Sequence, residues 1–278
     1  MILRYHITKH TLIKDFLDKK LSSNLIVSIN LYGMYIVNNQ QVKNYYPLKP
    51  GDVLEVVLPK EDSDNIKAIK GDLDILYEDS YLLILNKPDG LATLPTGVHY
   101  NNSLANIVAG YFARMGIESG IHFVNRLDLP TTGIIVLAKN SLIAGMMKDA
   151  ILSKKYLLVV NNHLSGRGMI EGGIYKEDDM KRKFTKDFIN SKTVYDIVMS
   201  KNKQSLVVAT LLTGKTHQLR LHFSSIGAPI KGDKMYGDDQ SDKLYLHSYY
   251  LEFIHPITNE KIVIVHYPKW YDQTKWYQ

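Results

Sequence analysis

The sequence predicts a protein of mixed helix and strand content, in which a small N-terminal domain precedes a larger C-terminal one. Its 278 residues are enough for one large domain and one small domain. Segments with strand-like alternation and segments with helical spacing occur on both sides of one charged stretch. That stretch, PKEDSDNIKAIKGD at residues 59–72, is the best candidate for a linker. We therefore expect domains at residues 1–66 and 67–278.

The composition is that of an ordinary globular protein, and it excludes several kinds of chemistry. Hydrophobic residues make up 45% of the chain and charged residues 22%. The net charge of +6 suits a polyanionic partner, although a basic enzyme of another kind would carry the same charge. The chain has no cysteine, which excludes disulfides, iron–sulfur clusters, cysteine-rich zinc sites and thiolate nucleophiles. Because we find neither a signal peptide nor an apolar run of roughly 20 residues, we expect a soluble, cytoplasmic protein without a membrane span.

The N-terminal part contains one helical pattern, one ambiguous segment and two strand patterns. In TLIKDFLDKKLSS, Leu12, Phe16 and Leu17 recur at helical spacing. The segment NLIVSIN is rich in β-branched residues and fits either a short helix or a strand. GMYIVNNQQVK predicts a strand with an Asn-rich turn, and LKPGDVLEVVLP predicts a turn that enters a strand.

The C-terminal part begins with two expected strands in LDILYEDSYLLILNKPDG, residues 73–90. SLANIVAGYFARMG predicts a helix capped by Ser103 and ended by Gly116. We expect VNRLD, residues 124–128, to be a strand, LPTTG a turn, and IIVLA a strand that is apolar on both faces. SLIAGMMKDAILSK predicts a helix opened by Asn140, after which KKYLLVV returns to strand.

The stretch TGKTHQLRLHFSSIGAPIKGD fits two different periods. Its residues alternate from Thr216 to Phe223, as in a strand. Leu219, Phe223 and Ile226 instead follow the helical i, i+4, i+7 spacing. We favour the helix, because Thr216 can cap it and Gly227 can end it.

Candidate functional side chains lie at the expected strand end and in this expected helix. Asp128 precedes a turn, where functional residues are common but where most aspartates only cap the turn. Arg220 could hold Asp128 in a two-pronged ion pair, or it could bind a phosphate. His217 would lie in the first turn of the helix, where anions bind readily. No set of histidines and carboxylates has metal-ligand spacing, so we expect no metal.

Two further features could contact a nucleic acid. Lys155 and Tyr156 open a strand, and the tyrosine ring either belongs to the core or stacks on a flipped base. KRKFTKD brings together Lys181, Arg182 and Lys183, which predicts either a solvated loop or a phosphate-contacting surface.

Several longer motifs, in the same order, resemble the RluA-type pseudouridine synthases. They are NRLDLPTTGIIVLAKN, KKYLLVV, TGKTHQLRLHFSSIGAPIKGDKMYG and LYLHSYYLEFIHPITNE, preceded by LYEDSYLLILNKPDGL, which resembles the family's opening element. The resemblance spans roughly residues 73–265. It implies an α+β fold with a mixed, largely antiparallel central sheet, flanked by helices and loops around a catalytic cleft.

The resemblance assigns roles to the candidate residues. The family's catalytic aspartate falls on Asp128, its active-site tyrosine on Tyr156 and its pairing arginine on Arg220. The residues expected to bind substrate are Asn125, Arg126, Lys155, Lys181, Arg182, Lys183 and His217. The implied reaction isomerises uridine to pseudouridine in structured RNA, ribosomal RNA in preference to transfer RNA, without a cofactor. Whether the aspartate acts as a nucleophile or as a base stays open.

The sequence departs from the family pattern around the catalytic aspartate. The family usually has His before Arg-Leu-Asp, a basic and then an acidic residue after it, and Thr-Ser-Gly. This chain has Asn125, Leu129, Pro130 and Thr132 at those positions. Because the family's His lies next to the reacting nucleotide, we expect the RNA contacts to differ while the chemistry is retained.

The N-terminal part resembles a small S-four-like RNA-binding domain, an α/β domain that often precedes this catalytic domain. The matching portion is GMYIVNNQQVKNYYPLKPGDVLEV. From Leu21 to Val42 there is no Lys or Arg, so a degenerate domain kept for stability is the alternative.

Two other interpretations of the whole chain are disfavoured. A non-catalytic RNA-binding relative would not need Asp128, Tyr156 and Arg220 together. A carboxylate hydrolase would need a second acid at suitable spacing, and none stands out. We expect a monomer whose partner is RNA, with no membrane and no obligate protein partner.

Overall fold

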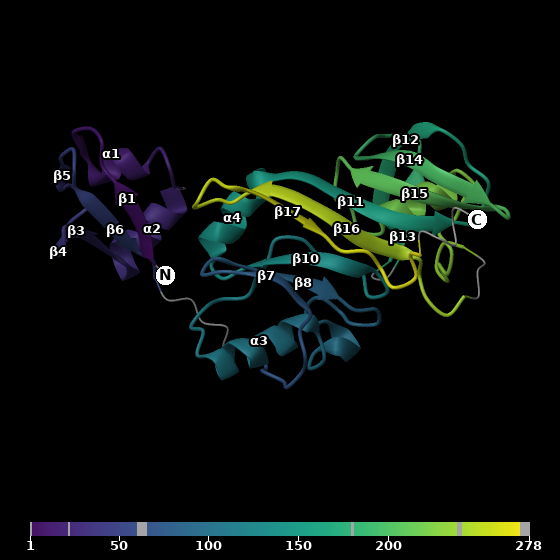
Figure 1. The fold of residues 1–278 in the computed structure, drawn as a ribbon, viewed down its shortest axis with the longest axis horizontal. Coiled ribbons are helices and arrows are strands. Elements are labelled where there is room, and N and C mark those ends of the chain that lie inside the picture. Colours follow the sequence, from purple (N-terminus) through teal and green to yellow (C-terminus); the bar gives the residue numbers. More distant parts are fainter. Residues whose placement is uncertain (1, 22, 60–65, 179–180, 238–240, 273–278) are drawn as a thin grey trace.

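The larger part of the chain forms the α+β architecture that the sequence predicts (Figure 1). The computed structural model describes residues 2–21, 23–59, 66–178, 181–237 and 241–272. Within them the chain forms an eleven-stranded sheet, a four-stranded sheet and a two-stranded one. No helix in these ranges is long and apolar enough to cross a membrane.

The N-terminal elements form the four-stranded sheet and two helices packed on it. The strand order is β1-β6-β3-β4, and its pairings are antiparallel. The ambiguous segment NLIVSIN is helical. The bounds are β1 (Ile2–His6), β2 (Thr11–Leu12), α1 (Ile13–Leu17), α2 (Ser23–Tyr32), β3 (Met34–Val37), β4 (Gln40–Val42), β5 (Pro47–Leu48) and β6 (Val53–Val57). The expected Asn-rich turn is present, with Asn38 and Asn39 at φ 49° and 68°, a backbone region that Asn tolerates well.

The C-terminal elements form the eleven-stranded sheet. Its main path is β13-β12-β14-β15-β11-β16-β10-β8-β7, with β17 on β16 and β9 on β10. Among the described strands of this sheet only β10 and β16 pair in parallel. The bounds are β7 (Ile75–Glu78), β8 (Leu82–Lys87), η1 (Gly97–His99), α3 (Leu104–Met115), β9 (His122–Phe123), β10 (Thr132–Ala138), α4 (Ser141–Ala150), β11 (Ile151–Val160), β12 (Arg167–Lys176), β13 (Arg182–Thr185), β14 (Ser191–Lys201), β15 (Gln204–Leu211), α5 (Gln218–Ser225), β16 (Leu246–Ile254) and β17 (Lys261–Val265).

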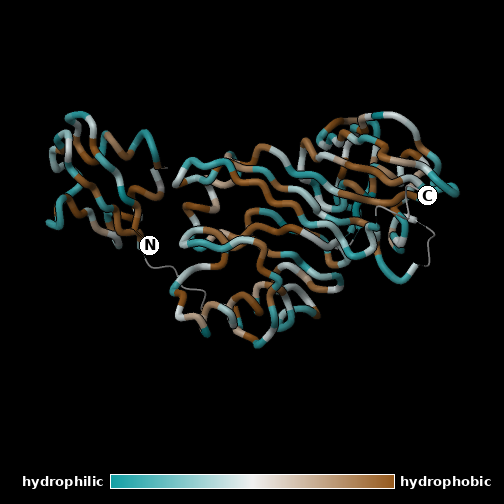
Figure 2. Tube along the Cα trace, in the orientation of Figure 1, coloured by the Kyte–Doolittle hydropathy of each residue, from teal (hydrophilic) through white to brown (hydrophobic). Residues whose placement is uncertain are grey.

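The central strands are buried on both faces, which explains their unbroken apolar runs. On β8, Leu83 and Leu85 pack in the cluster that contains Phe112 of α3. Leu82 and Ile84 point to the other face and pack in the cluster of α4. Figure 2 shows the same distribution, with hydrophobic residues along the central strands and hydrophilic ones mainly at the loops.

Local signals predicted both ends of α3 but only the beginning of α4. Ser103 caps α3 in a capping box with Asn106, and Gly116 ends it at φ 66°. Asn140 caps α4 by accepting a hydrogen bond from Leu142 N. The expected end of α4 was too late. The chain is already strand from Ile151, because β11 pairs with β15 and β16 and these long-range pairings override the helical pattern.

The expected linker falls partly outside the described residues, at 60–65. Residues 66–74 contain neither helix nor strand, and they lie along α3. There Ile69 N donates to Asn106 O (3.1 Å), and Asn106 Nδ2 donates to Lys67 O (2.8 Å). We propose a domain boundary near residue 66, because the residues that follow it pack against α3 of the larger part.

The two parts also contact each other through side chains. The apolar cluster of the N-terminal part includes Leu142 of α4, and Tyr81, Met146 and Ile257 pack against it. The small domain therefore covers apolar surface of the large one.

Candidate active site

Asp128 lies in an irregular segment between β9 and β10, so the expected strand VNRLD is wrong. Pairing of β9 with β10 ends at Phe123. Two residues later, Asn125 Oδ1 accepts a hydrogen bond from Val136 N (2.9 Å). A side chain thus replaces the backbone partner, and the following residues are free to leave the sheet. The turn after Asp128 is present as expected, closed by Thr131 N donating to Asp128 O (3.0 Å).

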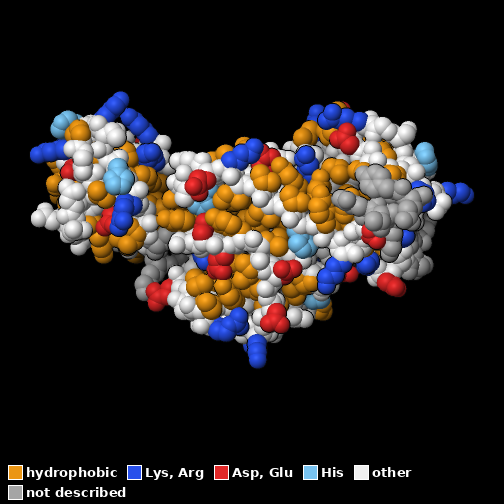
Figure 3. Space-filling view, in the orientation of Figure 1, with side chains coloured by type: hydrophobic (Ala, Val, Ile, Leu, Met, Phe, Trp, Pro, Cys, Tyr) orange, Lys and Arg blue, Asp and Glu red, His pale blue; other side chains and the backbone are white. Residues whose placement is uncertain are grey.

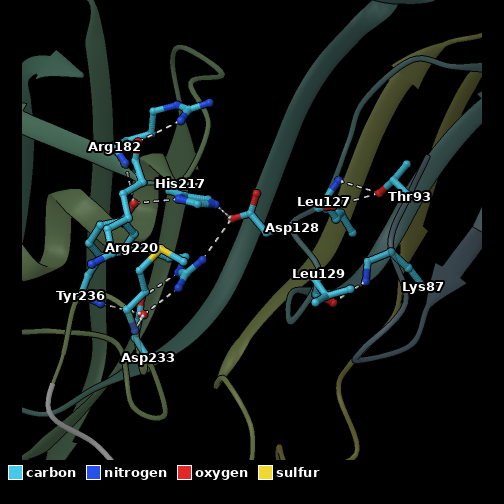
Figure 4. A network of polar contacts seen from close by, with 12 residues as sticks. Lys87, Thr93, Leu127, Asp128, Leu129, Arg182, His217, Arg220, Asp233 and Tyr236 are labelled. Carbon is cyan, nitrogen blue, oxygen red and sulfur yellow. Dashed lines mark hydrogen bonds and ion pairs between the residues drawn. The ribbon is translucent and has the colours of Figure 1, made fainter. Parts of the chain in front are cut away.

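The residues on either side of Asp128 are anchored by hydrogen bonds (Figure 4). Thr93 Oγ1 donates to Leu127 O (2.9 Å), and Lys87 Nζ donates to Leu129 O (3.0 Å). Lys87 is fully buried and donates to two other backbone carbonyls. Burial lowers its pKa to about 8, although Asp89 and Asp128 favour the charged form. The aspartate therefore lies on a fixed loop.

Arg220 and His217 approach Asp128 from the other side of the site. Arg220 Nη1 and His217 Nε2 each lie 3.9 Å from Asp128 Oδ2. These distances are longer than hydrogen bonds, so the carboxylate keeps free lone pairs beside a positive charge.

The two-pronged pair expected between Arg220 and Asp128 is wrong. Arg220 Nε and Nη2 donate to Asp233 (2.8 and 2.7 Å), whose side chain is fully buried. Burial alone would lower the pKa of Arg220, but its pairing with Asp233 and its proximity to Asp128 raise it. Asp233 holds the guanidinium, which presents only its remaining edge to Asp128.

The segment that carries Arg220 is the helix α5, which confirms the choice of helix over strand. The expected cap Thr216 is wrong, because the N-cap residue is His217 at φ 58°. Gln218 Oε1 instead accepts from Lys215 N (2.9 Å), so a side chain inside the helix satisfies the turn before it. Gly227, at φ 71°, follows the helix as expected.

A pocket of about 640 Å³ lies beside Asp128. Asn125, Arg126 and His217 line it, as does the ring of Tyr156, which is only 4% exposed and also packs in the core. Tyr156 thus belongs to the core and also lies at the pocket wall, and its stacking on a flipped base stays a prediction.

Lys154 lies at the pocket, where the sequence analysis expected Lys155. Lys154 lines the pocket, with Nζ 5.6 Å from the centroid of the Tyr156 ring. Lys155 Nζ lies over Tyr250, 5.1 Å from the ring centroid, on the opposite face of β11. The expectation for Lys155 is corrected because successive residues of a strand point to opposite faces.

The basic cluster KRKFTKD lies outside the pocket and is largely strand, so the expectation of a loop is wrong. Arg182 Nη1 donates to the carbonyls of Asp178 and Lys181 (2.9 Å each). Lys183 pairs with Glu177 at 2.6 Å, and Lys181 is exposed. These side chains are available to contact RNA outside the pocket but not inside it.

The sequence alone did not indicate five residues at or near the site: Lys87, Thr93, Lys154, Asp233 and Tyr236. Lys87, Asp233 and Tyr236 lie within the motifs KPDG and GDKMYG, but nothing in those motifs reveals burial or partners. In the described part of the chain, no group of three or more His, Cys, Asp or Glu could hold a metal ion.

Comparisons with known proteins identify the family. The sequence profile for RNA pseudouridylate synthase matches residues 81–225. The uncharacterized RNA pseudouridine synthase YjbO of Bacillus subtilis (strain 168) is 32% identical over 253 residues, which cover 87% of this chain and 89% of that protein. Ribosomal large subunit pseudouridine synthase C of Buchnera aphidicola subsp. Schizaphis graminum is 33% identical, covering 91% of this chain and 88% of that protein.

A solved structure has the same fold. Human RNA Pseudouridylate Synthase Domain Containing 1 superimposes with a TM-score of 0.57 at 24% identity, over 71% of this chain and 84% of that one. The segment matched by the family profile runs through β8, the loop of Asp128 and most of the sheet to the end of α5. The chain therefore belongs to the RluA-type family of RNA pseudouridine synthases, which are isomerases.

Proposed function

We propose that this protein converts uridine to pseudouridine in RNA with Asp128 as the catalytic carboxylate. One observation carries the assignment: of the described residues that line the pocket, only Asp128 has a carboxylate. Arg220 and His217 both face its Oδ2 atom. A carboxylate can act on a ribose as a nucleophile or as a base.

The reaction needs a uridine outside the base stack. Flipping a base out costs a few kcal/mol, and the cost is lowest in loops. The pocket volume of about 640 Å³ falls within the range typical of small-ligand sites. The Tyr156 ring offers a flat wall for the flipped base.

Two routes through Asp128 fit the site. The carboxylate either attacks C1′ of the ribose or removes the proton from C2′, and in both routes the N1–C1′ bond breaks. The uracil then turns in the pocket and C5 bonds to C1′. In the first route the Asp128–C1′ bond breaks in this step, and in the second route the proton returns from Asp128 to C2′. The C5 proton leaves to water and N1 ends protonated. The product is an isomer of the substrate, so no group from outside is consumed.

Basic side chains around the pocket suit the phosphates on either side of the uridine. Arg126, Lys154 and Lys215 line the pocket, and exposed lysines of the β13 region lie beyond it. Cationic side chains supply most of the sequence-independent affinity for RNA. Asn125 Oδ1 is engaged by Val136 N, so we propose that the contact made by the family's His at this position is changed here.

We propose ribosomal RNA, in preference to transfer RNA, as the substrate class. Relatives at 33% and 30% identity are named ribosomal large subunit pseudouridine synthases C and D. The comparison that tests the choice uses both RNAs, each transcribed with uridine tritiated at C5, and measures tritium release.

The variant Asp128→Asn tests the catalytic role on the same substrates. The amide keeps the shape but loses the charge, so we expect single-turnover tritium release to fall about a hundredfold or more. RNA binding and thermal stability should stay close to wild type. Asp72→Asn, which changes an exposed carboxylate before β7 that does not line the pocket, is the matched control. Activity of Asp128→Asn within about tenfold of wild type would refute the assignment.

A further inference from the structure

Tyr236 connects the backbone of β13 with the imidazole of His217 (Figure 4). Arg182 N donates to the Tyr236 hydroxyl (3.0 Å). The same hydroxyl lies 2.8 Å from His217 Nδ1, and the two rings meet edge to face at 5.6 Å. The far nitrogen of the imidazole, Nε2, faces Asp128 Oδ2 at 3.9 Å.

The hydrogen bonds of the hydroxyl determine which imidazole nitrogen carries the proton. A phenol has one hydrogen to donate, and it can also accept. Arg182 N already donates to this oxygen, and among the described residues the hydroxyl meets no acceptor other than His217 Nδ1, so this arrangement favours the hydroxyl as the donor to Nδ1. A nitrogen that accepts a hydrogen bond carries no proton, so in the neutral ring the proton is on Nε2.

We propose that Tyr236 holds His217 in the neutral tautomer protonated at Nε2, and that this N–H and Arg220 together fix Oδ2 of Asp128. The other carboxylate oxygen, Oδ1, is then left to act on the ribose. His217 and Tyr236 are positioning residues in this scheme, and the inference rests on the proposed catalytic role of Asp128. The 3.9 Å separation in the free enzyme shortens when substrate closes the site, as is common for catalytic contacts.

Burial, more than the charges around it, favours a neutral His217 ring. Burial lowers the pKa of His217, Arg220 and Arg182 lower it further, and Asp128 and Asp233 act in the opposite direction. A neutral imidazole can donate a hydrogen bond to Asp128 without placing another positive charge beside Arg220.

The backbone at His217 points to a functional reason for this residue. Its φ of 58° lies in the left-handed region, which Asn adopts more easily than most residues. Such conformations are strained for most residues other than Gly and cluster at functional sites. Asn would fit this backbone well, but its short side chain cannot place a donor where Nε2 lies.

This difference gives a matched pair of variants, His217→Gln and His217→Asn. The amide nitrogen of Gln can occupy the position of Nε2, whereas that of Asn can reach only the position of Nδ1. A purely structural role predicts that Asn, the better residue for this backbone, is at least as active. Our proposal predicts that Asn loses about a hundredfold in single-turnover rate, as for removal of one catalytic hydrogen-bond donor, and that Gln keeps about tenfold more activity than Asn.

Two further measurements keep the proposal testable if Gln strains the fold. Nitrogen-15 NMR of the wild-type imidazoles at neutral pH, with the His217 signals assigned by their loss in His217→Gln, should show a proton on Nε2 and none on Nδ1. Tyr236→Phe should lower the single-turnover rate about tenfold, while the Kd for RNA changes less than about threefold.

The outcomes separate this inference from the proposed function. A proton on Nδ1 in the wild type, or equal rates for His217→Asn and His217→Gln, would overturn the role of His217 even if Asp128→Asn is inactive. An active Asp128→Asn would overturn the proposed catalytic carboxylate itself.

Discussion

At the scale of single residues, Arg220 lies near two carboxylates and binds only one of them through both prongs. The Asp233 side chain is 0% exposed and receives the two hydrogen bonds, while the Asp128 side chain is 26% exposed and receives none from Arg220. A fully buried carboxylate needs complete compensation, and a catalytic one needs free lone pairs. Arg220 pairs fully with the buried Asp233 and leaves the lone pairs of Asp128 free.

The variant Arg220→Lys should therefore affect stability as well as activity. Lysine keeps the charge but cannot make the two-pronged contact with Asp233. We expect a loss of about 2 kcal/mol in the free energy of unfolding, part of the roughly 3–5 kcal/mol that breaking a buried pair costs. Single-turnover tritium release should fall about tenfold or more, because the edge facing Asp128 is no longer held.

Arg182→Lys is the control, because among the described residues the Arg182 side chain donates to backbone carbonyls at the surface and to no side chain. Its stability in urea should match wild type. Wild-type stability and turnover in Arg220→Lys would contradict the role that we assign to Asp233.

Two buried histidines predict how stability changes with pH. Burial lowers the pKa of His222 and of His247 to about 4. Since an unfolded histidine titrates near 6.5, the unfolded chain binds more protons between about pH 6.5 and 4. The stability from these residues is therefore complete above about pH 6.5 and is lost as the pH falls through that window. Urea titrations at several pH values should show the loss, and His222→Gln should make it smaller.

At the scale of elements, the parallel pairing of β10 with β16 joins the two halves of the large sheet. In this parallel contact Gly133 lies opposite Ser248, at φ 107°. A Cβ at this position would lie 2.3 Å from Ser248 O, a backbone atom that cannot move aside. Strand β10 begins directly after the loop of Asp128, so its pairing with β16 also fixes where that loop ends.

The variant Gly133→Ala should be strongly destabilising, by about 3 kcal/mol or more, because it combines backbone strain with a clash. Gly145→Ala is the matched control. That glycine lies in α4 with nothing within 4 Å of a Cβ, so alanine should add up to about 1 kcal/mol. Thermal unfolding of both variants decides the matter, and equal melting temperatures would contradict the close approach of the two strands.

At the scale of the whole molecule, basic side chains occur on both the small and the large part. The face drawn in Figure 3 shows Lys and Arg side chains scattered over both parts, among acidic and hydrophobic ones. The small domain also supplies apolar contacts to Leu142 and its neighbours in the large one. Deleting the small domain would therefore expose apolar surface as well as remove charge, and charge variants of the full chain are the cleaner test.

Two sets of three exposed lysines test which part anchors RNA. We expect replacing Lys181, Lys183 and Lys186 by Gln to lower the slope of log K against log salt by about 2–3, since each lost phosphate contact lowers it by about 1. Replacing Lys14, Lys19 and Lys43 should lower it by less than about 1, because the small domain has no Lys or Arg from residue 21 to 42. The reverse order would make the small domain the main RNA anchor.

The sequence alone determined those features that depend on neighbours along the chain. Ser103 and Asn140 cap their helices, Asn38 and Asn39 form their turn, and the apolar runs form the central strands. Caps, turns and alternation act over a few residues, so a single sequence is enough to reveal them. The motifs around Asp128 and Arg220 likewise indicated the family, which the comparisons confirm.

Only the tertiary structure decided which groups meet and what each meeting costs. In the folded chain Arg220 pairs with Asp233 and Lys155 points away from the pocket. Helix α4 ends at Ala150, and the Tyr236 hydroxyl contacts His217. These contacts join elements that are far apart along the chain. The sequence order alone does not say which of the possible contacts forms. Burial chooses between them: a carboxylate or an imidazole removed from water must be paired, and which group is removed from water is a property of the folded chain.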